Sequence, residues 1–238
     1  MSVESMGLRE SKKQETRQLI SDHATRLFLE QGFEQTTIAE IATAARVAKK
    51  TVTNYFPRKE DLALDHHEQF TASLAAAVAG RAEGESPLAA LRREFTAALD
   101  VRNPVAGFAG PDFARMIAES PTLTARLRDL HDQREEALTV ALAEAAHLTE
   151  AAHLAEAAHL AEAAHLAEAA DATETPSIAP RAAAALLGAA HRLLFRRIQE
   201  LTLAGRSNDV IATTLAPEAA HVFDLLEGAL GDFPTAAA

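Results

Sequence analysis

The sequence predicts an all-α protein. Alanine and leucine dominate its 238 residues, aromatic residues make up only 5%, and no stretch alternates polar and apolar residues as a strand would. Apolar residues recur instead at spacings of three and four, which places them on one face of a helix. A chain of this length can bury a substantial core and form one large domain or two smaller ones.

Composition excludes several classes of function. The chain has no cysteine, so disulfides, thiolate catalysis and cysteine-ligated zinc are ruled out. The first twenty residues are polar and charged, unlike a signal peptide, and no apolar run approaches the roughly 20 residues of a membrane span. No phosphate-binding glycine loop or grouping of serine, histidine and carboxylate is evident. We therefore expect a cytoplasmic protein that is not an enzyme, carries no cofactor and contacts no membrane.

Charge is distributed unevenly along the chain. The net charge is −11. Residues 1–60 nevertheless hold ten Lys and Arg against eight Asp and Glu, whereas the remainder holds 13 against 26. An acidic body repels DNA and confines any contact with DNA to the basic end.

The first predicted helix lies in the segment 11–58, which we expect to form one domain behind a mobile arm of residues 1–10. Ser11 is a candidate N-cap, and Ile20, Ala24 and Phe28 share one face of the helix. Gly32 is typical of a helix C-terminus.

Two short helices follow, joined by a tight turn. Thr37 and Glu40 have the spacing of a capping box, and a second helix is expected from about Lys49 to Phe56. Five basic residues and no acidic ones occur between Arg46 and Lys59. A small basic helix after a short turn fits the major groove of DNA. The alternative is an ordinary helical hairpin with a solvated basic face.

The segment from Leu27 to Leu62 resembles the N-terminal DNA-binding domain of TetR-family transcriptional regulators. The resemblance rests on Gly32-Phe33, Thr36-Thr37, Ile41-Ala42 and the run Tyr55-Phe56-Pro57-Arg58-Lys59-Glu60-Asp61-Leu62, and it covers roughly residues 11–62. Two positions depart from the family pattern. Arg46 stands where the family usually has a turn glycine, and Thr53 where it usually has an aromatic residue that contacts the DNA backbone.

The resemblance implies a homodimeric, ligand-responsive regulator, most simply a repressor that a small molecule releases from a palindromic operator. Asn54 is expected to read adenine and Lys50 guanine, while Thr37, Tyr55 and Lys59 hold phosphates. The complete set of predicted DNA-binding residues is Thr37, Lys49, Lys50, Thr51, Thr53, Asn54, Tyr55 and Lys59.

Residues 59–238 are expected to form a helical effector-binding and dimerisation domain. Its first helix should run from Lys59 to about Val78, and Ser86 and Pro87 have the pattern of an N-cap and first helical residue. In the family a small molecule binds in this domain, and its bulky apolar residues are candidates for lining the site: Phe70, Phe95, Phe108, Phe113 and Met116. Ordinary core packing is the alternative for each of them. Arg115 is a candidate partner for an anionic effector, or a surface charge.

A six-residue repeat, EAAHLA with one variant, occupies residues 144–168 within a predicted helix of residues 144–170. Six residues turn a helix by 600°, so successive leucines point in three directions and form no coiled-coil seam. We expect a low-complexity helix without a metal site. The alternative is an all-helical Glu/His metal-binding protein, because Glu-x-x-His occurs in di-metal bundles.

Two further helices are predicted near the C-terminus, one from Pro180 to Ala204 and one starting at Pro217. The first is apolar nearly all round over residues 182–195, so it needs partners on more than one side. By the resemblance these two helices pair with their copies as a four-helix dimer interface. A single monomeric core is the alternative.

Overall fold

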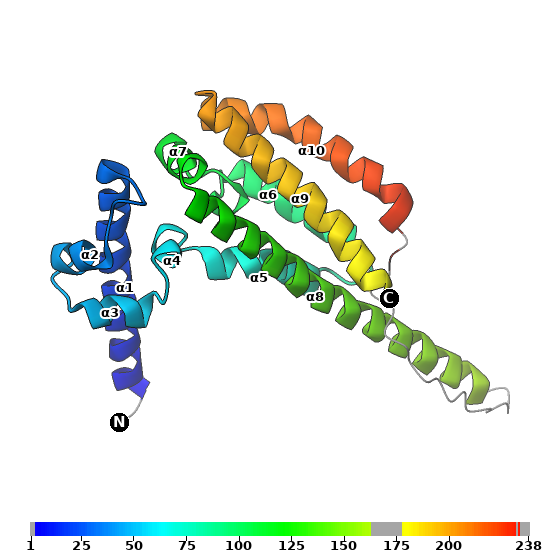
Figure 1. Ribbon diagram of the computed structural model, residues 1–238. Coiled ribbons are helices and arrows are strands. Elements are labelled where there is room, and N and C mark those ends of the chain that lie inside the picture. Colours follow the sequence, from blue (N-terminus) through cyan, green and yellow to red (C-terminus); the bar gives the residue numbers. More distant parts are fainter. Residues whose placement is uncertain (1–2, 163–177, 232, 234–238) are drawn as a thin grey trace. The chain divides into compact units, whose positions relative to one another are not determined.

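A computed structural model of the chain describes residues 3–162, 178–231 and 233 (Figure 1). The described residues form helices and connecting turns without a strand, which confirms the all-α prediction. In chain order the helices are α1 (Val3–Gln31), α2 (Ile38–Ala44), α3 (Lys49–Tyr55), α4 (Lys59–Ala63), α5 (His67–Ala79), α6 (Pro87–Asp100), the 3₁₀ helix η1 (Pro104–Ala106), α7 (Pro111–Glu119), α8 (Pro121–Glu162), α9 (Ala179–Leu203) and α10 (Asn208–Leu230).

The chain divides into two compact units. Unit 1 comprises Met1–Glu68 and Gly110–Asp129, and unit 2 comprises Gln69–Ala109 and Leu130–Ala238. This division differs from the boundary at residue 58 that we expected, because α4 and α7 fall in unit 1. Helix α8 contributes its first nine residues to unit 1 and the remainder to unit 2.

Unit 1 is built on α1, whose buried face carries Ile20, Ala24 and Phe28 as predicted. The helix begins at Val3 rather than at Ser11, so residues 3–10 are not an arm outside the helix. The predicted N-cap at Ser11 is wrong, because its Oγ donates instead to Glu15 Oε1 (3.1 Å) within the helix.

The predicted helix from Lys59 to Val78 is wrong, since it is interrupted between Ala63 and His67, which end α4 and begin α5. Two side chains of α1 engage the residue at this break. Arg17 Nη2 donates to the carbonyl oxygen of Asp65 (3.4 Å), and Ser21 Oγ donates to its Oδ2 (2.6 Å). These bonds stabilise a non-helical path in the absence of any proline or glycine, which is why the sequence pattern did not show the break.

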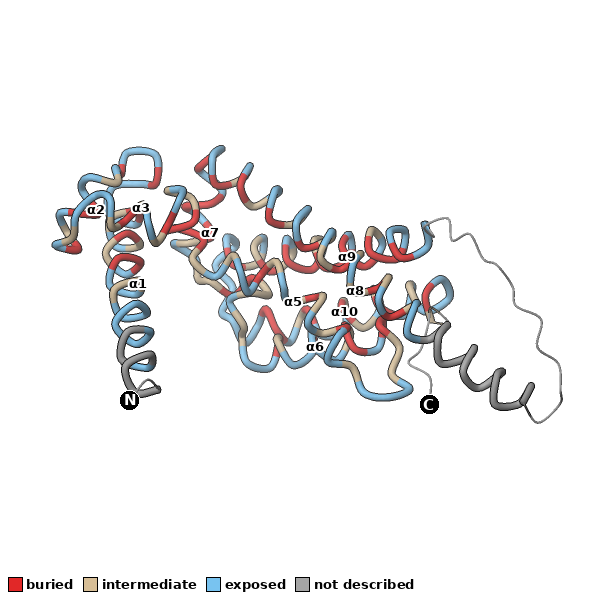
Figure 2. The backbone as a smooth tube through the Cα atoms, turned by 90° about the horizontal axis from the view of Figure 1, so that it is seen from below, coloured by how far each residue is buried: buried red, intermediate tan, exposed pale blue. Residues whose placement is uncertain are grey.

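Unit 2 buries one apolar core to which α5, α6, α8, α9 and α10 all contribute (Figure 2). Ser86 Oγ accepts from Ala89 N (3.1 Å) and Pro87 opens α6, which confirms the predicted start. Helix α9 runs almost as expected and is followed by Gly205 in a left-handed conformation (φ 73°).

The predicted start of the last helix is wrong. Helix α10 begins at Asn208, where Ser207 Oγ accepts from Val210 N (3.4 Å), and Pro217 lies inside the helix on an exposed face. A proline inside a helix costs one backbone hydrogen bond. The buried side chains of Ile211 and Leu215 anchor the turns before it.

The repeat continues α8 as a helix as far as Glu162, which confirms the predicted helix for that part. Its later residues and the repeat's side chains beyond Leu148 lie outside the described residues. Within the described ranges no helix is long and apolar enough to cross a membrane, and no group of three or more His, Asp or Glu side chains is arranged to hold a metal ion.

Candidate nucleic-acid interface

Helix α2 is fixed at its start by a reciprocal cap. Thr37 Oγ1 accepts from Glu40 N (3.3 Å), and Glu40 Oε2 accepts from Thr37 N (2.8 Å), which confirms the predicted capping box. The bonds from the Thr37 hydroxyl and backbone N–H hold the pKa of Glu40 below its usual range. The cap satisfies two backbone donors and orders the entry into the helix pair.

The turn between α2 and α3 places Arg46 in the left-handed region, with φ of 54°. This is the position where we expected a side chain to replace a turn glycine. Arg46 N donates to Thr43 O (3.1 Å) and Val47 N to Ala42 O (3.0 Å), so the turn keeps its hydrogen bonds. A left-handed backbone costs a non-glycine residue about 1–2 kcal/mol. The structure therefore tolerates the arginine at a cost in stability.

Helix α3 buries Val52 and presents polar side chains on its other faces. Lys49, Lys50 and Asn54 are exposed, and within the described part of the chain their side chains make no hydrogen bond or ion pair. The other three predicted residues of this helix are half-buried: Thr51, Thr53 and Tyr55. The helix thus carries two free cations and a free amide on one short segment.

The end of α3 is held by Arg17, a residue of α1 that sequence reasoning missed. Its Nη1 donates to the carbonyl oxygen of Tyr55 (3.2 Å), and its guanidinium lies 4.4 Å from the centroid of the Phe56 ring. The same side chain reaches Asp65, as described above. Arg17 therefore positions α3, and nothing in its local sequence distinguishes it from a surface arginine.

The structure gives Lys59 a different role from the phosphate contact that we predicted. Its Nζ donates to the carbonyl oxygens of Phe33 (2.9 Å), Thr36 (3.1 Å) and Glu34 (3.4 Å), and it lies 4.2 Å from the centroid of the Phe33 ring. The ammonium therefore holds the turn between α1 and α2.

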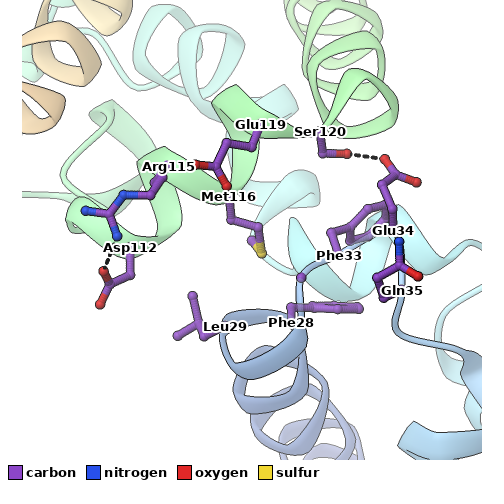
Figure 3. Close-up of a pocket in the computed structure, with 11 residues that line it drawn as sticks. Phe28, Leu29, Phe33, Glu34, Gln35, Asp112, Arg115, Met116, Glu119 and Ser120 are labelled. Carbon is purple, nitrogen blue, oxygen red and sulfur yellow. Dashed lines mark hydrogen bonds and ion pairs between the residues drawn. The ribbon is translucent and has the colours of Figure 1, made fainter.

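A second feature of unit 1 is a hollow of about 500 Å³ between the end of α1 and α7 (Figure 3). Ser120 Oγ donates to Glu34 Oε1 (2.5 Å), which lowers the pKa of that carboxyl. Arg115 is exposed and paired with Asp112 (3.1 Å), as expected for a surface charge. The lining carries the carboxylates of Glu34, Asp112 and Glu119. An acidic lining of this kind disfavours nucleic acid and other anions.

Unit 2 contains a smaller cavity of about 50 Å³. Of the five residues predicted to line an effector site, only Phe95 borders it; Met116 borders the hollow of unit 1. Phe70 packs edge-on against Phe195 (5.8 Å between centroids), and Phe108 is buried in the core. Phe113 is half-buried and borders neither space. The structure therefore does not bring the five together.

Three side chains in or beside this cavity have a shifted pKa. Arg134 and His191 line it, and His131 packs between the rings of Phe70 and Phe195. Burial lowers the pKa of Arg134 to about 10, and burial with the nearby Arg134 charge lowers the pKa of His191 to about 3. Burial also lowers the pKa of His131 to about 4. Both imidazoles are therefore neutral at physiological pH.

Comparison with known proteins points to one family. Residues 20–65 match the profile described as bacterial regulatory proteins, tetR family. A stretch of 93 residues is 39% identical to the HTH-type transcriptional regulator TcmR of Streptomyces glaucescens, covering 39% of this chain and 41% of that one. The match thus spans about two fifths of the length of the curated relative.

The matches among solved structures have low sequence identity. One is a tetR-family transcription regulator from Shewanella sp. PV-4, with 22% identity, a TM-score of 0.45, and coverage of 90% of this chain and 97% of that one. Another is the fatty acid degradation regulator FadR from Bacillus halodurans, with 14% identity, a TM-score of 0.49, and coverage of 87% and 94%.

Proposed function

We propose that the chain is a homodimeric, cytoplasmic repressor that a small molecule releases from a palindromic operator, because residues 20–65 match the profile of the tetR family of bacterial regulatory proteins. Regulators of this family bind DNA and are not enzymes. The observation that carries the proposal is the free polar face of α3, where Lys49, Lys50 and Asn54 have no protein partner among the described residues.

The chemistry of these side chains supports a division of roles. Asn54 carries an amide that can donate to and accept from the edge of adenine, and Lys50 carries a donor suited to guanine. Lys49, Thr51 and Thr53 complete the face toward the groove. The Tyr55 hydroxyl is proposed to bind a phosphate, which sets the register of the helix on DNA. The predicted phosphate contact of Thr37 is not proposed, because its hydroxyl donates to Glu40 Oε2 (2.8 Å).

The dimer is proposed to form through α9 and α10, which pack against each other in unit 2. Leu186 and Leu193, seven residues apart on α9, are 46% and 53% exposed, and Leu225 on α10 is 68% exposed. Ala182 and Ala189 continue the same exposed stripe at helical spacing. An apolar face of this kind favours pairing with a second copy. One short recognition helix also reads only a few base pairs, so two are needed for a specific site.

Helix α8 is the proposed link between effector and DNA, since it contributes residues to both units. In unit 1, Arg126 Nε and Nη2 donate to Asp61 Oδ1 of α4 (3.2 and 2.9 Å), and both side chains are buried. If α8 adopts two positions and a ligand binds the chain more tightly in one of them, the ligand shifts the fraction of chain bound to the operator. The size of the shift is set by the difference between the two binding free energies.

Selection of bound genomic fragments with the purified chain, followed by gel-shift on the recovered sequence, tests the DNA part of the proposal. A palindrome with half-sites about one helical turn apart is the expected result. Asn54→Ala should weaken operator binding with little effect on random DNA, whereas Lys49→Ala should weaken both and reduce the salt dependence. Equal binding of all sequences by the unaltered chain would contradict the proposal.

Sedimentation or light scattering tests the dimer. Leu193→Glu combined with Leu225→Glu should give a monomer with lowered operator affinity. Val101→Glu, which changes a residue 73% exposed beyond the end of α6, is the matched control and should remain dimeric. A dimer that survives the double substitution would exclude this face as the interface.

A further inference from the structure

A buried arginine, Arg134, lines the cavity of unit 2. This residue exposes only 7% of its surface. Its Nε donates to Ser73 Oγ (2.9 Å), and its guanidinium lies 4.6 Å from the centroid of the Phe70 ring. Within the described ranges the guanidinium forms no ion pair, and no nearby carboxylate offsets the effect of burial on its pKa.

An unpaired buried charge costs several kcal/mol, so proteins rarely retain one without a use. Arg126, on the same helix, shows the usual solution, since it is buried against the carboxylate of Asp61. The two terminal nitrogens of Arg134 form no hydrogen bond with the described residues, and neither is sealed within the protein, since the buried nitrogens without a partner are Arg81 Nε and Arg102 Nε. Their acceptor therefore comes from outside the chain, as water or as a ligand.

The rest of the lining restricts what that partner is. The walls are mainly apolar, with Leu74, Phe95 and Phe195 among them. His191 Nδ1 donates to Leu187 O (2.9 Å), so the neutral ring leaves Nε2 as an acceptor. The carboxylate of Glu94, an exposed residue at the cavity, disfavours a second negative charge. These features favour a single anionic group on an apolar body.

The size of the cavity sets a further limit. A cavity of about 150 Å³ is enough for benzene, so a cavity of about 50 Å³ admits only a carboxylate on a chain of about two or three carbons. A planar carboxylate also matches the fork of a guanidinium, which binds it through two parallel hydrogen bonds.

We propose that this cavity binds a small apolar monocarboxylate, whose carboxylate pairs with the terminal nitrogens of Arg134 while its body lies against Phe95 and Phe195. This assignment rests on the function proposed above, since it names the chemical class of the effector. It also explains why a guanidinium is retained at a position where an apolar side chain would cost less.

Calorimetric titration of the full chain with propionate at neutral pH tests the assignment, with 1-propanol and malonate as comparison probes. Propionate should bind, whereas the neutral alcohol and the dianion should bind at least tenfold more weakly. Arg134→Met should raise the Kd for propionate about ten- to a hundredfold, the loss expected for charge-assisted hydrogen bonds. Arg134→Lys should retain part of the affinity, and Arg196→Met, at an exposed arginine of α9, should retain all of it.

Thermal unfolding without ligand separates a binding role from a structural one. If Arg134 exists for binding, Arg134→Met should raise the melting temperature, because it removes an unbalanced buried charge. A lowered melting temperature together with unchanged propionate affinity would overturn the assignment, as would equal binding of propionate and 1-propanol. Gel-shift of the same samples distinguishes the two proposals. Propionate binding without operator binding refutes only the repressor, and operator binding without carboxylate binding refutes only the cavity's ligand.

Discussion

Acidification from about pH 8 to about pH 5 should destabilise unit 2 through His131 and His191. Both imidazoles have an ordinary pKa of 6.5, lowered in the fold to about 4 and about 3. The unfolded chain therefore binds these protons more readily than the folded chain, and stability decreases as the pH falls through 6.5 toward the folded values. At about pH 5 each ring should cost about 2 kcal/mol, since almost all of the effect in this window comes from protonation of the unfolded state.

Burial and neighbouring positive charges account for the lowered pKa of both rings. His131 lies 5.0 Å from the Phe70 ring and 5.3 Å from the Phe195 ring, between centroids, and the guanidinium charges of Arg134, Arg192 and Arg196 oppose its protonation. His191 is enclosed and faces the same Arg134 charge. The carboxyls with lowered pKa lose their contribution only below about pH 4.5, outside this window: Glu34, Glu40 and Glu85.

Urea unfolding followed by circular dichroism at a series of pH values measures the effect, with the chain concentration held constant because a dimer's stability depends on it. His131→Leu and His191→Leu should each remove about 2 kcal/mol of the loss between about pH 8 and pH 5. His221→Gln, at an exposed position of α10, controls for the loss of a histidine as such. An unchanged pH dependence in the combined variant would show that the two rings are not buried neutral groups.

Further substitutions test unit 1. Arg46→Gly should stabilise unit 1 by about 0.5–1 kcal/mol in urea unfolding, because relief of the left-handed strain exceeds the entropy that glycine loses; no gain would mean that the turn is not strained. Thr37→Ala should raise the Glu40 pKa toward its ordinary 4.5 in a carboxyl titration by NMR, and an unmoved pKa would exclude the capping box. Asp61→Asn should lower the free energy of unfolding by about 3–5 kcal/mol, because it leaves Arg126 buried without a counter-charge. Asp61→Leu combined with Arg126→Met should recover most of that loss. A small loss in Asp61→Asn would mean that water reaches the pair.

Local signals in the sequence were sufficient for most helix starts. The capping box at Thr37 and the Ser86-Pro87 start of α6 depend on residues three apart, and the structure confirms both. The interruption after α4 could not be predicted in this way. It depends on Arg17 and Ser21 reaching Asp65 from more than forty residues away. Hydrogen bonds between residues so far apart in the chain leave no periodic pattern in the sequence.

The candidate sites show the same limit. The exposed residues of α3 follow from helical spacing once the buried Val52 and Phe56 are recognised. Lys59 lies in the same basic stretch as Lys49, and the sequence does not distinguish the two. In the structure, however, three carbonyl oxygens accept hydrogen bonds from the Lys59 ammonium. Sequence reasoning also chose cavity residues by bulk, and bulk does not distinguish Phe95, which borders a cavity, from Phe108, which fills the core.

The contrast between Arg126 and Arg134 shows what the structure adds to the sequence. Both are arginines of α8, eight residues and therefore about 12 Å apart along the helix, and both are buried. Arg126 has its counter-charge within the chain, so its burial needs no ligand. Arg134 has only a hydroxyl partner in the described residues, which is why we propose an anion from outside the chain as its partner. Under that proposal, a carboxylate at Arg134 binds the same helix that holds α4 through Arg126, and α4 belongs to the unit that contains α3.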